Sequence, residues 1–416
     1  MMNEITIEIH HDGVWHQAAQ YRRGRSLVYD IDYAVRFMDE NHPMTRIGLE
    51  FDINFGEYSR KGWPAFLFDM IPGGAARAAW LKRHGQVDRG EADTDWDLLC
   101  FAASCPPGNL RIASAVEHFE MVAHPGFDRQ EIIDRNVDFI DYAEANGAIV
   151  AGASSVLGQA PKFLLVEDQN GFWHAEGALP AEKIKKHWLV KFPRGRSEED
   201  RLVLKNEAPY YELARDFGLK AGAPLIYEQN ALFIERFDRK VQGEKMIRYG
   251  LESASSICGW NDFGPGISND QVCHAMARLL EQPQASIIEF LRRDLLNIAL
   301  GNVDNHGRNT AYLKTPQSTS ISPLFDFAPM FLDPEGIPRA ARWEAERPIS
   351  MPDWGVVAES ISCPGLAAGD IRASLRLDAD RVAALPETMR CHGVDDVIIK
   401  RLAKRIADLA VSLKDV

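Results

Sequence analysis

Residues 291 to 330, LRRDLLNIALGNVDNHGRNTAYLKTPQSTSISPLFDFAPM, decide the fold, because an apolar, helix-like run gives way there to a polar cluster. Inside the cluster Asp304 and Asn309 are separated by four residues, and Asp326 follows a further apolar stretch. One short polar residue would indicate only a cap or a turn. Several carboxylates and amides beside apolar flanks are costly unless hydrogen bonds or a metal ion compensate them. Their number here favours a functional site.

The order and spacing of these residues are typical of phosphoryl transfer. In protein kinases an Asp of the catalytic loop accepts the proton of the substrate hydroxyl, and an Asn further along the loop binds magnesium. Asp304 and Asn309 have this spacing, and His306 lies between them. Asp326 stands in Phe-Asp-Phe-Ala, which resembles the metal-binding Asp-Phe-Gly of kinases with Ala in the last place.

Length and composition predict a soluble, cytoplasmic protein of two or three lobes. A chain of 416 residues is too long for one small core, and its 46% of hydrophobic residues can fill several. The sequence has no run of eighteen apolar residues and no basic start followed by an apolar core, so we expect no membrane span and no secretion. The net charge of −13 argues against direct binding to a nucleic-acid backbone, although a partner can still bring nucleic acid.

The cysteines show no close-paired spacing of the kind that binds metal, and a chain of this length does not need disulfides. We expect them to be reduced and mostly buried. The six are Cys100, Cys105, Cys258, Cys273, Cys363 and Cys391.

Residues 1 to 146 form the first of three predicted segments. Residues 4 to 20 alternate between apolar and polar around Asp12-Gly13, which indicates a β-hairpin. Residues 62 to 85 are expected to form a helix pair broken by Pro-Gly-Gly, and residues 128 to 145 an acidic helix. The histidines of the hairpin are not expected to bind a metal, because neighbours on a strand face opposite sides. They are His10, His11 and His16.

Residues 147 to 240 form the second predicted segment, which opens with a loop of small residues before an apolar strand at 162 to 167. Such a loop lets backbone amides approach phosphate oxygens closely. It is not a Walker A loop, because the Lys-Ser or Lys-Thr that should follow is missing. The candidate phosphate-binding residues are Gly152, Ala153, Ser154, Ser155 and Gly158.

A second strand, at 187 to 193, carries a single lysine, Lys191. In kinases a strand lysine after the glycine-rich loop binds the nucleotide phosphates and pairs with a glutamate from the next helix. The helix expected at 198 to 219 offers Glu207 and Glu212, and we prefer Glu207 because it precedes the apolar positions that would pack on the sheet. A glutamate that simply faces solvent is the alternative.

Two further strands are expected at 223 to 227 and 231 to 238. The second leads out of the sheet at Glu235, Arg236 and Phe237, where a kinase places the hinge that binds adenine through backbone groups. The third segment, residues 241 to 416, is predicted to be helical.

Helices are expected in the third segment wherever apolar residues recur three and four apart. The Pro- and Gly-rich region from 331 to 366 is either a mobile loop over the site or turn-rich packing. The expected helices are residues 268 to 280, 285 to 300 and 396 to 414.

Taken together, these motifs resemble the HipA family, the kinase toxins of bacterial toxin and antitoxin pairs. The resemblance runs from about residue 150 to 330, and more loosely through the N-terminal module and the C-terminus. It implies an α+β, two-lobed protein-kinase-like fold with a small β-rich lobe, a helical C-terminal lobe and an added N-terminal α/β subdomain. The motifs are the small-residue loop, the strand lysine, the helix glutamate, Glu-Arg-Phe-Asp-Arg at 235 to 239, Asn302-x-Asp304-x-His306-x-x-Asn309 and Asp326.

The resemblance further implies a serine/threonine protein kinase that uses ATP and Mg2+. Asp304 would be the catalytic base, and Asn309 and Asp326 the magnesium ligands. Lys191 would anchor the phosphates with Glu207 as its partner. The ATP-binding residues would be Gly152, Ala153, Ser154, Ser155, Gly158, Lys191, Glu235, Arg236, Phe237 and His306.

Family members can phosphorylate a serine of their own glycine-rich loop, and Ser154 or Ser155 would be that serine here. The family also implies a protein substrate, which in known cases includes an aminoacyl-tRNA synthetase of the translation machinery, and a DNA-binding antitoxin as partner. No residue of this chain identifies the substrate.

Two alternatives stay open. A metal-dependent phosphohydrolase or nuclease could use Asp304, His306 and Asp326 around an activated water, which leaves Lys191 and the small-residue loop without a task. A regulator without catalytic activity, which binds nucleotide and a DNA-binding partner, is the other.

Overall fold

The computed structural model describes residues 2–40, 42–59, 61–88, 91–118, 121–149, 161–243, 245–264, 266–346 and 351–416. The chain divides into two compact units, each made of three stretches of sequence. The first unit consists of Met1–Arg194, Glu228–Gly264 and Tyr312–Thr319, and the second of Gly195–Tyr227, Pro265–Ala311 and Ser320–Val416.

The N-terminal part of the first unit is an antiparallel sheet with the strand order β4-β3-β2-β1-β5. The predicted hairpin is confirmed, because Asp12 (φ 52°) and Gly13 (φ 83°) turn the chain between β1 and β2. Both residue types tolerate this left-handed backbone. The strands are β1 (Glu4–His11), β2 (Val14–Arg22), β3 (Ser26–Tyr29), β4 (Glu57–Ser59) and β5 (Leu110–Ile112).

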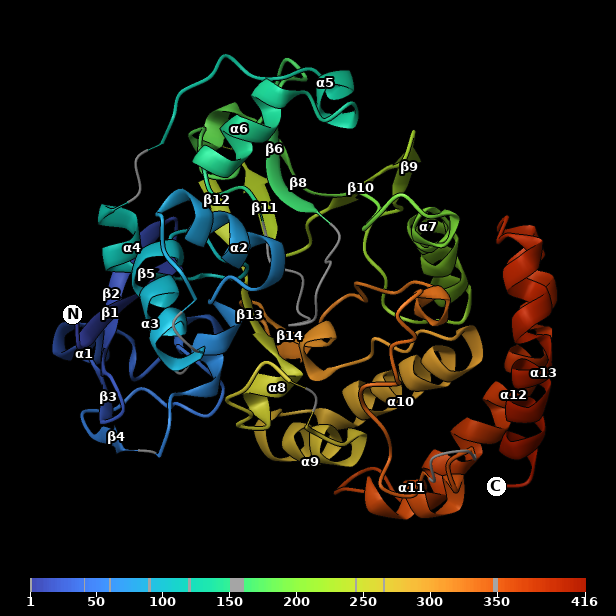
Figure 1. Ribbon diagram of the computed structural model, residues 1–416. Coiled ribbons are helices and arrows are strands. Elements are labelled where there is room, and N and C mark those ends of the chain that lie inside the picture. Colours follow the sequence, from blue (N-terminus) through green and yellow to red (C-terminus); the bar gives the residue numbers. More distant parts are fainter. Residues whose placement is uncertain are drawn as a thin grey trace. The chain divides into compact units, whose positions relative to one another are not determined.

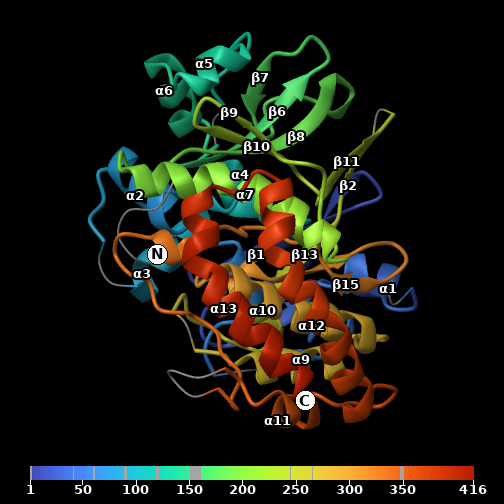
Figure 2. The same ribbon diagram turned by 90° about the vertical axis from the view of Figure 1, so that its right-hand side faces the viewer.

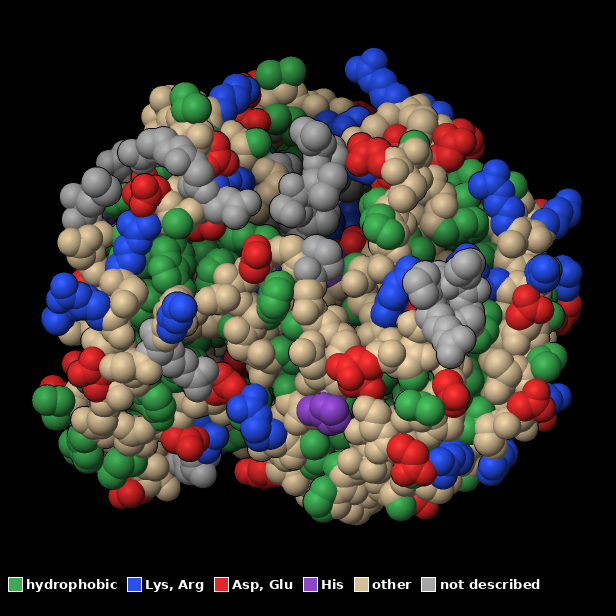
Figure 3. Space-filling model, turned by 60° about the horizontal axis from the view of Figure 1, so that its bottom comes forward, with side chains coloured by type: hydrophobic (Ala, Val, Ile, Leu, Met, Phe, Trp, Pro, Cys, Tyr) green, Lys and Arg blue, Asp and Glu red, His purple; other side chains and the backbone are tan. Residues whose placement is uncertain are grey.

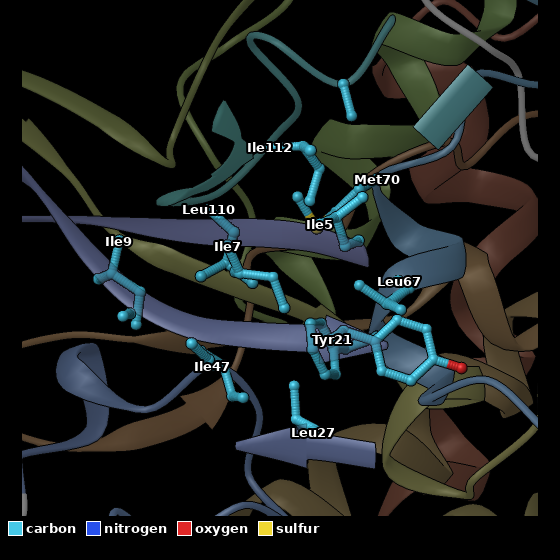
Figure 4. Close-up of a cluster of buried hydrophobic side chains, with 14 of the residues drawn as sticks. Ile5, Ile7, Ile9, Tyr21, Leu27, Ile47, Leu67, Met70, Leu110 and Ile112 are labelled. Carbon is cyan, nitrogen blue, oxygen red and sulfur yellow. The ribbon is translucent and has the colours of Figure 1, made fainter. Parts of the chain in front are cut away.

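Alternate residues of this sheet point into one hydrophobic core, which Figure 4 shows at close range. Ile7 and Ile9 of β1 meet Leu110 and Ile112 of β5 there. Of the helix pair predicted from 62 to 85, only the second member is an α-helix, and the first is a 3₁₀ turn. The helices here are α1 (Ile31–Phe37), η1 (Pro43–Thr45), η2 (Ala65–Asp69), α2 (Gly74–Arg83), α3 (Glu91–Ala102) and α4 (Ala113–Glu117).

A second antiparallel sheet of the first unit carries the strands β7-β6-β8-β10 in that order, of which Figure 1 labels β6, β8 and β10, and Figure 2 also β7. The single helix predicted from 128 to 145 is wrong: Arg135 has a φ of 52°, which no helix continues, and two helices result. The elements are α5 (Arg129–Ile133), α6 (Val137–Ala145), β6 (Lys162–Asp168), β7 (Trp173–Ala175), η3 (Ala181–Lys183), β8 (Ile184–Lys191) and β10 (Ala231–Glu235).

The chain leaves β10 into a hairpin that the sequence did not predict. Its strands, β11 and β12, are antiparallel, and β13 and β14 lie side by side in another sheet. The strand predicted to reach residue 238 therefore ends at Glu235. These elements are β11 (Arg239–Gln242), β12 (Lys245–Arg248), β13 (Gly250–Ser253), α8 (Ala254–Ile257) and β14 (Ala311–Lys314).

The second unit is mainly helical, and the helices predicted around 198, 268, 285 and 396 are all confirmed. The long helix α12 was not predicted, and Pro386 lies inside it. Figures 1 and 2 show α12 and α13 side by side, and α10 packs against α9, α12 and α13. The elements are α7 (Glu198–Asp216), β9 (Ile226–Glu228), α9 (Asn269–Leu279), α10 (Pro283–Leu300), η4 (Gly307–Asn309), β15 (Thr319–Ile321), η5 (Met330–Leu332), α11 (Trp354–Ser360), α12 (Ala368–Cys391) and α13 (Asp396–Lys414).

Part of the irregular region from 331 to 366 is packed, whereas Pro334, Glu335, Gly336 and Pro338 are exposed. Trp343 and Ala341 are buried, and the Ala340 amide donates a hydrogen bond to the carbonyl of Val303 at 3.0 Å. These contacts favour turn-rich packing over a mobile loop for residues 340 to 343.

All six cysteines are free thiols, as predicted. The expectation that most are buried is wrong, because only Cys100 and Cys273 are buried and Cys391 is exposed. On the face shown in Figure 3, acidic and basic side chains are interspersed. Among the described residues, no helix is long and apolar enough to cross a membrane.

Candidate active site

The polar loop begins where α10 ends, at Gly301. This glycine closes the helix in the left-handed conformation (φ 68°), and its carbonyl accepts a hydrogen bond from the Phe331 amide at 2.9 Å. A Cβ atom at position 301 would lie 2.6 Å from the ring of Phe331. Only glycine therefore lets the chain turn from the apolar helix into the loop at this point.

Three predicted site residues come together within this loop. The side-chain amide of Asn309 donates a hydrogen bond to the backbone carbonyl of Asp304 at 2.7 Å, and its backbone amide donates to the carbonyl of His306 at 2.9 Å. The His306 ring lies 3.6 Å from the Asp304 carboxylate, measured from Nε2 to Oδ1. Since Nδ2 of Asn309 is used inside the loop, a metal ion would be bound through Oδ1.

The loop rests on a buried carboxylate that sequence reasoning missed. Asp294, on the inner face of α10, accepts hydrogen bonds from Asn305 of the loop (3.2 Å) and from the indole of Trp343 (2.7 Å). Arg339 also donates to it. The signal in the sequence that could have revealed Asp294 was an acidic residue within an apolar helical run. Burial alone would lower the pKa of Arg339, but Asp294 and Glu346 outweigh burial and raise that pKa.

Asn305 also ties the loop to the irregular region that follows. Its side chain exchanges two hydrogen bonds with the backbone of Ala341, each 3.0 Å long. The loop therefore has supports on two sides: α10 beneath it and residues 340 to 343 beside it.

Asp326 is one of the few residues other than glycine with a positive φ, 55°. Aspartate tolerates this left-handed backbone, as at Asp12, so the conformation indicates a local turn. The preceding segment is fixed, because the Leu324 amide donates to the carbonyl of Lys220 at 2.7 Å. The following residue, Phe327, is buried against the ring of Tyr210 on α7, with ring centroids 5.5 Å apart.

The side chains of this part of the second unit that could bind a metal ion do so through oxygen atoms, which are the ligands that hard cations prefer. Besides Asp304, Asn309 and Asp326, the oxygen Oδ1 of Asn302 is buried and accepts no hydrogen bond from any described residue. A buried acceptor without a donor is costly unless a ligand supplies one. Carboxylate and amide oxygens are the type of ligand that Mg2+ takes together with phosphate oxygens and water.

The two candidate glutamates on the helix α7 differ in their burial. Glu207 is buried on α7, whereas Glu212 is partly exposed and forms an ion pair with Arg215 one turn later. The hydroxyl of Tyr210 donates to the carbonyl of Leu300 at 2.9 Å, which fixes α7 on the end of α10. Glu207, the residue preferred from the sequence, is thus the buried one of the two, and its pairing with Lys191 stays a prediction.

Lys191 and the predicted hinge belong to the first unit. Lys191 is buried at the end of β8, opposite Lys162 of β6 and Leu232 of β10. In the hinge, the Glu235 carboxylate binds Lys186 at 2.5 Å, and the Arg236 amide donates to the carbonyl of His187 at 2.9 Å.

The small-residue loop lies outside the described residues. Nothing structural is therefore assigned to Gly152, Ala153, Ser154, Ser155 or Gly158. Among the described residues, no group of three or more His, Cys, Asp and Glu side chains is arranged to hold a metal ion.

One comparison with a solved structure, at a TM-score of 0.68, identifies the class of fold. A solved complex of HipA, HipB and operator DNA from Shewanella oneidensis MR-1 matches with a TM-score of 0.68 and 17% identity, covering 99% of both chains. The proinflammatory kinase CtkA of Helicobacter pylori matches with a TM-score of 0.39 and 12% identity, over 63% of this chain and 92% of that one. The chain has the predicted α+β, two-lobed kinase-like fold with an added N-terminal α/β subdomain.

Sequence comparison then identifies the family. A family model described as the HipA-like C-terminal domain matches residues 154–380, more than half of the chain, and the chain belongs to that family. The serine/threonine-protein kinase toxin HipA of Shewanella oneidensis is 27% identical over 193 residues. That match spans 41% of this chain and 42% of the relative.

Proposed function

We propose that the chain is a serine/threonine protein kinase of the HipA type that transfers the γ-phosphoryl group of ATP to a protein hydroxyl with the help of Mg2+. The observation that carries the proposal is a hydrogen bond of 2.7 Å from the side-chain amide of Asn309 to the backbone carbonyl of Asp304. It joins the two residues of the predicted catalytic loop. The place of Asp326 in Phe-Asp-Phe-Ala, which resembles the Asp-Phe-Gly of kinases, supports a metal-binding role for that residue. Family membership supports the class of reaction.

In this proposal the chain's own residues position the reactants. Asp304 accepts the proton of the serine or threonine hydroxyl, whose oxygen forms the new bond to the γ-phosphorus while ADP leaves with the bridging oxygen. Lys191 holds the phosphates and is paired with Glu207. Asn309, through Oδ1, and Asp326 would hold Mg2+, which supplies charge neutralisation for the transferring group.

The hinge segment would read adenine through its backbone. The amide of Arg236 is already bonded to His187, so this amide does not serve adenine, and the contacts fall to the neighbouring groups of Glu235 and Phe237. His306, beside Asp304, would line the phosphate side of the nucleotide. Small-residue loop contacts to phosphate are also part of the proposal.

The partners follow from the relatives. The matched Shewanella complex contains HipB and operator DNA, and we infer a DNA-binding antitoxin partner for this chain. A protein hydroxyl is the substrate, with a component of translation as the candidate class, and Ser154 or Ser155 is the candidate for autophosphorylation. A cytoplasmic location stays a prediction.

Intact mass after incubation with Mg-ATP, followed by mapping of any added phosphate, tests the proposal. We expect added phosphoryl mass on the chain, or label from the γ-position of ATP on a protein of a bacterial lysate. Asp304→Asn should abolish transfer without loss of folded protein, because the base is removed and the shape is kept. Asp380→Asn is the matched control, since Asp380 is exposed and paired only with Lys414 at 3.0 Å in the described structure.

Other outcomes would contradict the proposal. Release of free phosphate or nucleotides with no labelled protein would favour the hydrolase or nuclease. Nucleotide-dependent thermal stabilisation without transfer to any candidate would favour the regulator. Transfer by Asp304→Asn at the rate of the unmodified chain would remove Asp304 from its role.

A further inference from the structure

A cluster of buried charges lies directly after the hinge, within the first unit. Arg236 binds Asp238 through two parallel hydrogen bonds, from Nε at 2.9 Å and from Nη2 at 2.7 Å. Arg236 also donates to Glu176 at 3.3 Å, and the same carboxylate oxygen accepts from Nδ1 of His187 at 2.8 Å. We call this the charged cluster, and its members are Glu176, His187, Arg236, Asp238, Arg239 and Arg248.

The paired side chains flank Phe237 of the hinge. Arg236 and Asp238 are two positions apart, and their side chains meet where the chain bends, at Phe237 and Asp238, between the end of β10 and the start of β11. A bidentate arginine–carboxylate pair is geometrically demanding. The pair therefore fixes the backbone course of the hinge.

The charged cluster also binds a turn of the N-terminal module. Arg239 donates to the carbonyls of Gly108 (2.6 Å) and Pro106 (3.0 Å), and the amide of Gly108 donates to Asp238 at 2.9 Å. Gly108 has a φ of 85°, and a Cβ atom there would lie 3.1 Å from the backbone nitrogen of Leu251. The turn therefore contacts the charged cluster through these hydrogen bonds and also lies close to Leu251 of β13.

Charge balance shows how strongly the members depend on one another. Burial alone would raise the pKa of Asp238, but Arg236 and Arg239 outweigh burial and hold that pKa well below its usual range. Burial lowers the pKa of Arg239 to about 10 against the attraction of Asp238, and Arg248 adds repulsion. Three arginines share two carboxylates, so loss of one partner leaves a buried charge unpaired.

We propose that Asp238 and Arg239 are positioning residues through which the turn at residues 106 to 108 sets the geometry of the adenine-binding hinge. The N-terminal module thereby becomes a determinant of nucleotide affinity. This inference rests on the proposed kinase function, because it assigns adenine to the segment from Glu235 to Phe237. Neither residue needs to touch the nucleotide.

Calorimetric titration of the full chain with Mg2+ and a non-hydrolysable ATP analogue tests the inference. We expect Arg239→Gln and Asp238→Asn to weaken the Kd by about tenfold, because a displaced hinge loses binding in every nucleotide-bound state. Arg239→Lys keeps the positive charge but loses the planar guanidinium that donates several hydrogen bonds, so its Kd should lie between those of the unmodified chain and Arg239→Gln. Gly108→Ala changes only the turn, and it should weaken the Kd in the same direction.

The titration separates positioning from simple stabilisation. A purely structural role would reduce the number of binding sites per chain, which counts folded protein, and leave the Kd of the folded fraction unchanged. Asp95→Asn is the matched control, since Asp95 is a buried carboxylate of the same module that pairs with Arg77. It should lower stability and leave the Kd unchanged.

Each remaining result decides the matter. An unchanged Kd in Gly108→Ala together with either cluster variant would overturn the inference while the kinase function stands. Absence of nucleotide binding and of transfer in the unmodified chain would overturn the proposed function and this inference with it. A weaker Kd in Asp95→Asn as well would show that any loss of stability in the module has this effect, which would also overturn it.

Discussion

The loop from Gly301 to Asn309 and the charged cluster of the first unit both hold polar side chains in fixed positions, but they use different kinds of partners. The loop holds its side chains through short hydrogen bonds between residues a few positions apart, such as Asn309 with Asp304. The cluster joins segments that are far apart in sequence, since Arg239 reaches Pro106 and Arg236 reaches Glu176. Local spacing can reveal the first arrangement but not the second.

Asp294 is an exception to this contrast, because the loop also depends on Asp294, which lies in α10 and accepts a hydrogen bond from Asn305. Asp294→Ala should lower the free energy of unfolding by about 3–5 kcal/mol, since Arg339 and the Trp343 indole are left buried without their acceptor. Urea unfolding followed by tryptophan fluorescence measures the loss. A loss below about 1 kcal/mol would mean that the loop carries its own structure.

Gly301 tests the local side of the comparison. Gly301→Ala should cost about 1–3 kcal/mol, because it combines a positive φ with a close approach to Phe331. Gly369→Ala serves as the control: Gly369 lies in α12, and a Cβ atom added there would have no atom within 4 Å, so the change should be neutral or slightly stabilising. Equal thermal midpoints for the two variants would contradict the role given to Gly301.

His10 should make the free energy of unfolding sensitive to acid. Burial, and after it the positive charges of Arg248, Arg239 and Arg111, together lower the pKa of His10 to about 3. The unfolded chain, with the ordinary pKa near 6.5, therefore binds more protons between these two values. Stability is complete above pH 6.5 and should fall as the pH drops, by up to about 1.4 kcal/mol per pH unit from this group.

Unfolding midpoints in urea at pH 7 and pH 5 measure this dependence. His10→Gln cannot titrate, so the variant should lose less stability than the unmodified chain over the same interval. A pH dependence identical in both proteins would show that His10 is not responsible.

The smallest effect is expected at Glu212, and it sharpens the choice of glutamate on α7. Glu212→Gln removes a partly exposed pair with Arg215 and should change stability by about 0.5 kcal/mol or less. It should leave the affinity for Mg-ATP unchanged, whereas Glu207→Gln should weaken it. The reverse order of affinities would assign the lysine partner to Glu212.

Much of the fold could be predicted because its signals are local. The turn at Asp12-Gly13 and the helices with regular apolar spacing follow from a few neighbouring residues. Helix α12 was missed, with Pro386 inside it, and the region from 128 to 145 was interpreted as one helix because nothing in its spacing indicates the left-handed Arg135.

The candidate site follows the same rule. The spacing of Asp304 and Asn309 predicted a shared loop, which the structure has. The roles of Asp294 and of the arginines after the hinge could not be predicted, because each depends on partners brought close by folding. Whether Lys191 serves the same nucleotide as Asp326 stays a prediction.

The insertion of the turn at Gly108 between Asp238 and Arg239 also bears on the limits of the family segment. The recognisable family segment begins at residue 154, yet its own Asp238 and Arg239 are completed by residues that precede that boundary. Removal of the N-terminal module would therefore leave the Asp238 carboxylate and the Arg239 guanidinium without these backbone partners.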